Sequence, residues 1–171
     1  NGAHIINASW GQPDKSRALA DAIAAAHEAG VIIVAAAGND RNDLLSYPAA
    51  YPESITVAAL DHTDRRAGFS NFGAFVDLSA PGENILSTIP DNRYELFSGT
   101  SMAAPHVAGV AALILGQHPE FTQRDVETIL RNAVDPIVAD RPIGAGRLDA
   151  AKAVRLQTPL PEARLRVPEL L

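Results

Sequence analysis

The sequence contains no cysteine. This absence excludes disulfide bonds, thiolate–zinc sites and a cysteine nucleophile. Long apolar runs are also missing: the longest, from Val31 to Ala37, falls far short of the roughly 20 residues that a membrane-spanning helix needs. That run has the length of a buried strand, so the sequence predicts no contact with a membrane.

Positive charge is scarce as well. The chain has 14 lysine and arginine residues against 20 aspartate and glutamate residues, a formal net charge of −6 at pH 7. Nucleic-acid binding needs a basic stripe that neutralises phosphates, and none is present, so we expect no nucleic-acid partner. The length of 171 residues and the apolar content of 47% are typical of one globular domain with a sizeable core.

Strand and helix patterns alternate along the start of the chain. An apolar strand from Ile5 to about Ser9, a helix over residues 14–29 and a strand from Val31 to Ala37 would form one βαβ unit. The unbroken apolar run of the second strand is typical of the centre of a parallel sheet. Beyond it we expect strands at 55–60 and 75–79, a hairpin at 85–89 and 94–97, and helices at 100–117, 122–134 and 149–156.

The last third of the chain carries a helix signal and a change of composition. Thr122 and Asp125 resemble a capping box. Residues 157–171 combine prolines with mixed charges, which predicts a tail or linker after a domain of residues 1–156. The helix that the capping box opens would have an apolar face made of Val126, Ile129, Leu130, Ala133 and Val134.

The most informative segment runs from Phe97 to Gly109, with the sequence FSGTSMAAPHVAG. A glycine turn delivers Ser101 to the start of a helix that is apolar on nearly all sides and is therefore expected to be buried. Because a helix start carries free N–H groups and a partial positive charge, a serine oxygen there could attack a carbonyl while the N–H groups hold the oxyanion. The alternative is a serine or threonine N-cap on an ordinary helix.

This segment closely resembles the nucleophile segment of the subtilisin-like serine proteases, and the run VAAAGN, ending at Asn39, resembles their oxyanion segment. The resemblance implies that Ser101 is the nucleophile and that the Asn39 side chain and the Ser101 N–H hold the oxyanion. Without the resemblance, Asn39 would be a turn residue. The likeness extends from about Ile5 to Val154 and implies a three-layer α/β fold, a mostly parallel sheet flanked by helices, present as a partial domain.

The segment from Ile5 to Gly11, IINASWG, resembles the family's substrate-binding strand, to which an extended peptide adds through main-chain hydrogen bonds. Trp10 would then wall a pocket for a substrate side chain; otherwise it is a partly buried aromatic. Ser46 would lie near the base of the pocket for the residue before the scissile bond, which suggests an uncharged pocket. The substrate-binding residues implied by the resemblance are Ser9, Trp10, Gly11, Ala36, Ala37, Gly38, Ser46 and Thr100.

The segment YPAAYPES, followed later by Asp77, resembles a region that binds a cation in some relatives. Its ligands would be the carbonyls of Ala49, Tyr51 and Ser54 and the carboxylate of Asp77, and such oxygen ligands suit calcium or a monovalent cation. The alternative is that Asp77 only caps a turn. The same likeness makes Tyr47–Pro48 a candidate cis peptide bond.

Two parts of the serine-protease triad are missing. The family's aspartate motif, Asp-Ser/Thr-Gly, and its histidine motif, His-Gly-Thr-His, do not occur in the chain. His106 matches a non-catalytic position of the family, a hydrogen-bonded core histidine. A serine needs a base that an acid orients. We therefore expect this chain to be the C-terminal part of a catalytic domain, to need the N-terminal part with Asp and His as its partner, and to be inactive alone.

The leading interpretation is thus a serine endopeptidase that cleaves a peptide or protein through an acyl-enzyme. By the resemblance it would need no cofactor for its chemistry and would be secreted or extracytoplasmic. The alternative is a non-catalytic peptide-binding module on the same scaffold. Another kind of α/β hydrolase is disfavoured because the Gly-x-Ser-x-Gly elbow is absent.

Overall fold

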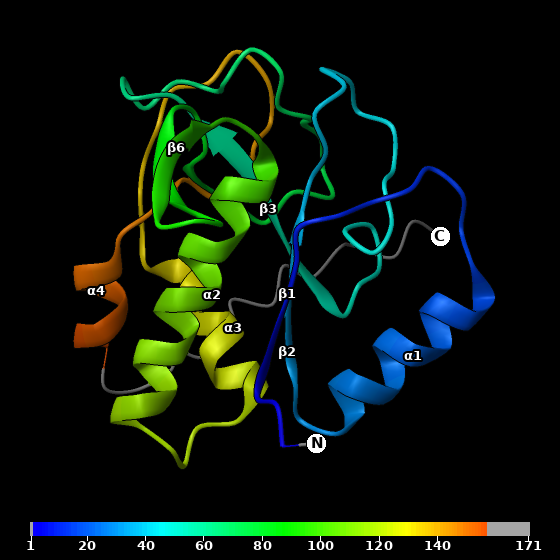
Figure 1. Ribbon diagram of the computed structural model, residues 1–171. Helices are drawn as coiled ribbons and strands as arrows, with labels where there is room; N and C mark the ends of the chain where they lie inside the picture. The colour runs from blue at the N-terminus through cyan, green and yellow to red at the C-terminus, as the bar shows by residue number, and fades with distance from the viewer. Residues whose placement is uncertain (1, 157–171) are drawn as a thin grey trace, which may run out of the picture.

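The computed structural model describes residues 2–156, so the tail or linker expected at 157–171 lies outside the described residues. A six-stranded sheet in the order β1-β2-β3-β4-β8-β7 forms its centre, and β5 pairs with β6 in a separate sheet (Figure 1). The strands are β1 (Ile5–Ala8), β2 (Ile32–Ala36), β3 (Ser54–Leu60), β4 (Leu78–Pro81), β5 (Ile85–Ile89), β6 (Arg93–Phe97), β7 (Val134–Asp135) and β8 (Arg147–Leu148). The helices are α1 (Arg17–Glu28), α2 (Thr100–Gln117), α3 (Gln123–Asn132) and α4 (Ala150–Arg155).

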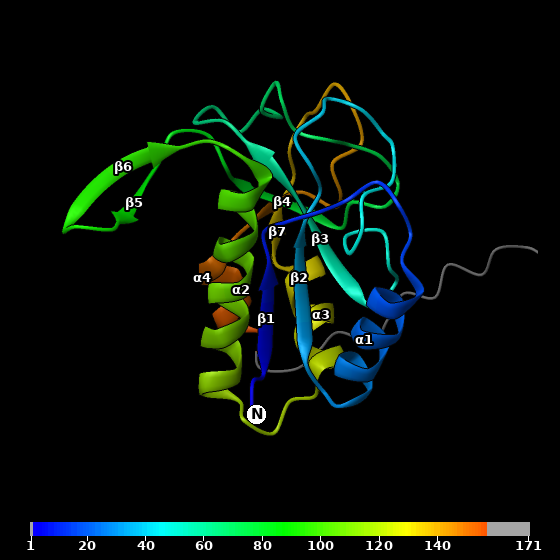
Figure 2. The ribbon, with the colours of Figure 1, turned by 45° about the vertical axis from the view of Figure 1, so that its right-hand side comes forward.

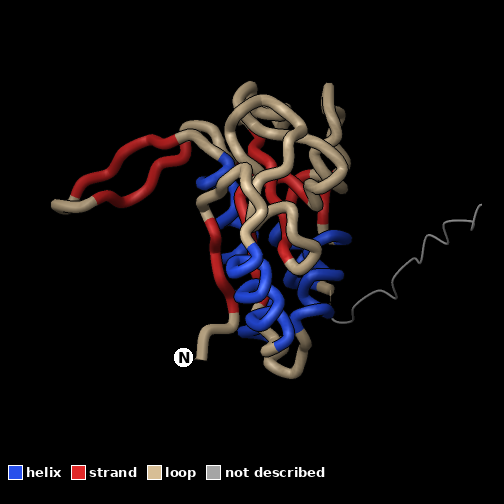
Figure 3. Tube along the Cα trace, turned by 90° about the vertical axis from the view of Figure 1, so that its right-hand side faces the viewer, coloured by secondary structure: helices blue, strands red, loops and turns tan. Residues whose placement is uncertain are grey.

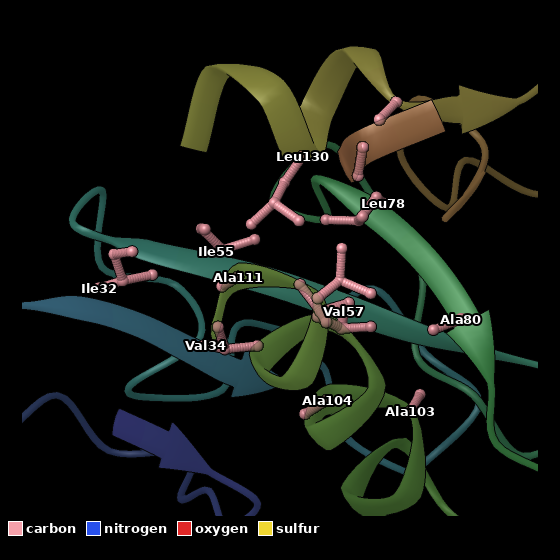
Figure 4. Close-up of a cluster of buried hydrophobic side chains, with 14 of the residues drawn as sticks. Ile32, Val34, Ile55, Val57, Leu78, Ala80, Ala103, Ala104, Ala111 and Leu130 are labelled. Carbon is pink, nitrogen blue, oxygen red and sulfur yellow. The ribbon is translucent and has the colours of Figure 1, made fainter. Parts of the chain in front are cut away.

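Helices cover both faces of the sheet, which gives three layers (Figure 2). Because successive side chains of a strand point to opposite faces, Ile33 of β2 packs with Ile23 of α1, whereas Val34 packs in the cluster that contains α2. In that cluster Leu130 of α3 and Ala111 of α2 also meet the sheet (Figure 4). Within the six-stranded sheet, β1 to β4 and β8 run parallel and β7 pairs antiparallel with β8, while β5 and β6 of the separate sheet are also antiparallel. The predicted three-layer, mostly parallel α/β fold is confirmed.

The expected elements are present, with some ends displaced. The capping box of Thr122 and Asp125 forms, and the Tyr47–Pro48 peptide bond is cis, as predicted. The strand expected at 75–79 lies later, as β4, because residues 73–76 form a turn in which the N–H of Val76 donates to the Gly73 carbonyl. Val134 belongs to β7 and not to the face of α3, which stops at Asn132.

Two regions are more exposed than the sequence predicts. Helix α2 was expected to be buried on nearly all sides, but His106, Gly109, Ala112, Leu113 and Gly116 are exposed along one side. The β5–β6 hairpin projects from the body of the molecule (Figure 3). Its side chains Leu86, Tyr94 and Leu96 are exposed. Within residues 2–156, no helix is both long and apolar enough to cross a membrane.

Candidate active site

The start of α2 places Ser101 above the carboxyl ends of the central strands. Gly99 precedes the helix in an extended conformation and, as a glycine, has no side chain of its own to cap the helix. The N–H of Gly99 donates to the carbonyl of Gly82, just after β4, at 2.8 Å, which anchors the turn to the sheet. The N–H of Met102 donates to the Gly99 carbonyl at 3.0 Å, whereas no hydrogen bond within residues 2–156 engages the N–H of Ser101, which lies at the positive end of the helix dipole.

Asn39 follows β2 and lies against the same helix start. Its Oδ1 accepts hydrogen bonds from the backbone N–H and from the hydroxyl of Thr100, both at 2.9 Å. This contact fixes the orientation of the amide, because Oδ1 must face the Thr100 donors and Nδ2 must then face the other way. In residues 2–156 no hydrogen bond engages Asn39 Nδ2, so it remains available as a donor next to Ser101.

Thr100 and Gly38 connect the end of β2 to the start of α2. Thr100 is 0% exposed, and its hydroxyl accepts a hydrogen bond from the N–H of Gly38 at 3.1 Å while it donates to Asn39. Gly38 has a φ of +110°, and a Cβ there would lie 2.4 Å from Asn71 Nδ2. Glycine is therefore required at this position. The arrangement sets the geometry between Asn39 and Ser101 before any substrate binds.

Ser101 and Ser9 form a reciprocal pair of hydrogen bonds. The Ser101 hydroxyl donates to the Ser9 carbonyl at 3.0 Å, and the Ser9 hydroxyl donates to the Ser101 carbonyl at 2.8 Å. The pair joins the end of β1 to α2. Within residues 2–156 no histidine bonds to the Ser101 hydroxyl, and His106 is exposed with its ring nitrogen Nδ1 2.8 Å from the Met102 carbonyl. His106 is thus hydrogen-bonded but is not the core histidine that the resemblance implied.

The other expected substrate residues gather at the ends of β1 and β2. The register pairs Ala8 with Ala35, so Ser9, Trp10 and Gly11 emerge beside Ala36, Ala37 and Gly38. Trp10 is 52% exposed, which leaves about half of it free to wall a pocket. Ala37 is fully buried, so its side chain is not presented to a ligand.

A hollow of about 320 Å³ lies next to Gly11 and Ser46. These two residues are in contact, because a Cβ at Gly11 would meet the Ser46 hydroxyl. The pocket for the residue before the scissile bond was expected to be uncharged, but Asp40 contributes to the lining of this hollow. Sequence reasoning missed Asp40 because it lies just beyond the VAAAGN segment. The lining consists of Gly11, Gln12, Pro13, Asp40, Asn42, Leu44, Leu45, Ser46 and Asn71.

Asn71 is a further residue that sequence reasoning missed. It is buried, its Oδ1 accepts from the N–H of Asp40 at 2.8 Å, and its Nδ2 donates to the Ala37 carbonyl at 3.1 Å. It therefore positions the loop that follows Asn39. A polar Ser-Asn pair inside the mostly apolar run GFSNFG was the signal that could have identified it.

The four residues of the expected cation site also converge. Ala49, Tyr51, Ser54 and Asp77 line one cavity of about 190 Å³. Arg131 of α3 lines it too, and its Nε lies 3.0 Å from Asp77 Oδ1. The carboxylate that would bind a cation is therefore already paired with a guanidinium.

Comparison of the sequence with known proteins identifies the family of this chain. Residues 1–150 match the family model described as the subtilase family, Peptidase_S8. Subtilisin BL and Subtilisin Savinase, both from Lederbergia lenta, are each 40% identical over 155 residues, which cover 91% of this chain and 58% of each relative. The chain thus spans little more than half the length of these relatives.

Solved structures of proteases have the same fold as this chain. A protease of Pseudoalteromonas arctica PAMC 21717 superposes with a TM-score of 0.86 at 35% identity, over 91% of this chain and 51% of that one. The S218A mutant of the protease domain of PatA gives a TM-score of 0.82 at 36% identity, over 91% and 60% of the two chains. From the family match, these relatives and the shared fold, it follows that the chain belongs to the subtilase family of serine proteases.

Proposed function

We propose that this chain supplies the nucleophile and the oxyanion-stabilising groups of a serine endopeptidase. The observation that carries the proposal is the orientation of Asn39, whose Oδ1 is held by Thr100 so that Nδ2 is free beside Ser101. A preoriented donor of this kind acts where negative charge develops in the transition state. Its second partner is the backbone N–H of Ser101 at the start of α2.

In the proposed reaction the substrate peptide lies along Ser9–Gly11 in extended form. Ser101 Oγ leaves the Ser9 carbonyl and attacks the scissile carbonyl carbon, while the hydroxyl proton passes to a base. The carbonyl oxygen becomes the oxyanion between Asn39 Nδ2 and the Ser101 N–H. This tetrahedral intermediate then collapses and expels the amine, which receives the proton that the base had taken from Ser101. Water then hydrolyses the acyl-serine. The steps need no cofactor.

The base would come from an N-terminal part of the same catalytic domain, carrying the Asp and His motifs, and we propose that this part docks beside β1. Among residues 2–156, strand β1 pairs with β2 alone, and Ile6 is 38% exposed on it. Parallel sheets are normally covered on both faces, and α2 is apolar but exposed on the adjoining side. Residues of both elements and of the adjoining loops line a hollow of about 490 Å³: His4, Ile5, Ala112, Leu115, Gly116 and Pro119.

The location of the protein follows the family in this proposal: we infer that it acts outside the cytoplasm, on peptides or proteins. The absence of cysteine and the excess of acidic residues are compatible with that setting. Neither a nucleic acid nor a membrane is proposed as a partner.

Covalent labelling tests the proposal. The full-length protein is treated with a fluorophosphonate probe and digested, and the adduct is located by mass spectrometry. We expect the adduct on Ser101 and none in Ser101→Ala. If Ser101 is not labelled while an extended peptide still binds, the chain is a peptide-binding module instead.

A second measurement tests the need for a partner. The 171-residue chain alone is expected not to hydrolyse a peptide substrate that the full-length protein cleaves. Turnover by the isolated chain that Ser101→Ala abolishes would show that the base lies within these residues.

A further inference from the structure

The cavity at Asp77 holds a positive charge that belongs to the protein. Arg131 reaches it from α3, and its Nε donates to Asp77 Oδ1 at 3.0 Å. The other carboxylate oxygen, Oδ2, accepts from the Thr56 N–H at 2.7 Å. Both oxygens of the one charged ligand are thus engaged by donors.

The remaining oxygens of the cavity are only partly free. The Ala49 carbonyl accepts from the Thr56 hydroxyl at 2.5 Å, and the Tyr51 carbonyl accepts from the Ser54 N–H at 3.0 Å. Ser54 is only 3% exposed, and its Oγ has no hydrogen-bond partner among residues 2–156. Calcium requires six to eight oxygen ligands, and a carboxylate engaged by Arg131 does not suit it. The residues present do not fit a metal ion while the guanidinium stays.

A second carboxylate keeps the guanidinium in place. Glu127, one helical turn before Arg131, has a side chain that is 11% exposed, and its Oε2 lies 3.8 Å from Arg131 Nη1. Its other oxygen lies 3.3 Å from Nε2 of His27 on α1. A cation that displaced Arg131 from Asp77 would draw this charge away from Glu127, and a buried carboxylate without its partner is costly.

We infer that Arg131 is the built-in cation of this site. Its guanidinium neutralises Asp77 and ties α3 to the segment before β4, so that this region binds no metal ion and its stability does not depend on added cations. This role for Arg131 is an alternative to the expected calcium or monovalent-cation site, and it does not depend on the proposed protease activity. Removing the guanidinium should create a cation site from Asp77, Ser54 Oγ and the neighbouring carbonyls.

Thermal unfolding of the full-length protein tests this inference. The Tm is measured in choline chloride with a chelator, and then in potassium chloride and in calcium chloride at matched ionic strength. The chain is compared with Arg131→Met, Asp77→Asn and the double variant. Arg17→Met is the matched control, because in the described part of the chain Arg17 pairs only with the exposed Asp21 on α1. Cation binding at this site would appear as a saturable rise in Tm with added potassium or calcium that Asp77→Asn removes.

We expect no such signal in the unmodified protein. Arg131→Met should lower the Tm by roughly 2–8 °C and gain a saturable potassium or calcium response that the double variant lacks. Arg17→Met should behave as the unmodified protein does. An Asp77-dependent response in the unmodified protein, or Arg131→Met without any response, would overturn the inference.

Discussion

The two ends of the six-stranded sheet are completed in different ways. At one end β1 has a single neighbour, and Ile6 and Asn7 are exposed. At the other end the short β7 turns back antiparallel to β8, and charged groups bind the two strands together. Arg147 donates to Asp135 at 2.7 Å and to Asp64 at 2.8 Å, and Lys152 also donates to Asp135.

The proposed catalytic groups therefore lie near one end of the sheet, and the ion pairs that stabilise the fold lie at the other. The end formed by β7 and β8, called the closed end below, carries ion pairs and no proposed catalytic group. The opposite end, at β1, is called the open end. The open end lies beside Ser9 and Ser101, whose hydrogen bonds join β1 to α2. Substitutions near the open end should therefore change the rate with little change in stability, whereas substitutions at the closed end should do the reverse.

The largest effect is expected at Asn39. Asn39→Asp keeps an oxygen for the Thr100 donors but removes the Nδ2 donor and adds a negative charge where the oxyanion forms. In the full-length protein kcat should fall by at least the 10²–10³-fold that is typical of losing one such donor, a magnitude established in a member of this family. Steady-state kinetics measure the fall, and KM should change little because the donor acts in the transition state.

Asn39→Ala separates the two roles of this side chain. It removes the contact with Thr100 as well, so it should also lower the free energy of unfolding by about 1 kcal/mol, the size of a lost helix cap. Asn132→Ala is the matched control for both variants, because Asn132 is the last residue of α3 and its side chain donates to the Thr128 carbonyl of the same helix. An unchanged kcat in Asn39→Asp would remove Asn39 from the proposed oxyanion site.

The sequence predicted the open end better than the closed end, for physical reasons. The runs around Ser101 and Asn39 are long, and β2 and α2 have strong apolar patterns, so their elements were found. Strands β7 and β8 have two residues each, which is too few to show a periodic pattern. The pairing of Arg147 with Asp64 joins residues far apart in the chain and leaves no local signal.

Local sequence patterns also could not predict the exposed side of α2 or the residues that position loops, Asn71 and Arg131. The apolar composition of α2 predicts burial, but the surface that would bury His106 and Leu113 is not formed by residues 2–156. Asn71 and Arg131 act through contacts with loops that precede them in sequence by about thirty and fifty residues, as their hydrogen bonds show. Such contacts become visible only when the fold is known.

The closed end gives an effect of intermediate size. Asp135→Asn removes the charge that Arg147 and Lys152 share, and we expect the Tm at pH 7 to fall by roughly 2–4 °C with kcat unchanged. Hydrogen bonds from Lys152 and then from Arg147 lower the pKa of Asp135 below its usual range. A lowered pKa in the folded state stabilises the protein above the pKa of the unfolded state, and this stabilisation is lost as the pH falls through the folded-state pKa.

The difference in Tm between the unmodified protein and Asp135→Asn should therefore be present at neutral pH and shrink in acid. Differential scanning calorimetry at several pH values measures it. Asp21→Asn, which removes an exposed partner of Arg17, serves as the control and should leave the Tm nearly unchanged. A loss of kcat without a loss of Tm in Asp135→Asn would contradict the prediction that substitutions at the closed end change stability and not the rate.

The smallest effect concerns the substrate preference at the open end. Asp40 is exposed, lines the hollow beside Ser46, and has no hydrogen bond or ion pair to its carboxylate within residues 2–156. A lysine or arginine before the scissile bond could lay its aliphatic stem over Leu44 and Leu45 and place its charge near Asp40. Asp40→Asn should then lower kcat/KM for basic substrates roughly two- to fivefold relative to a leucine substrate, because one exposed ion pair contributes about 0.4–1 kcal/mol.

Asp43→Asn is the matched control for this preference, since Asp43 belongs to the same loop but does not line the hollow. The ratio of kcat/KM for basic and leucine substrates should stay constant in this control, and the preference lost in Asp40→Asn should also weaken in the unmodified protein as salt is added. If both variants change the ratio equally, the effect comes from the net charge of the loop. The hollow would then not be the pocket for the residue before the scissile bond, and the open end would bind substrate through its main chain alone.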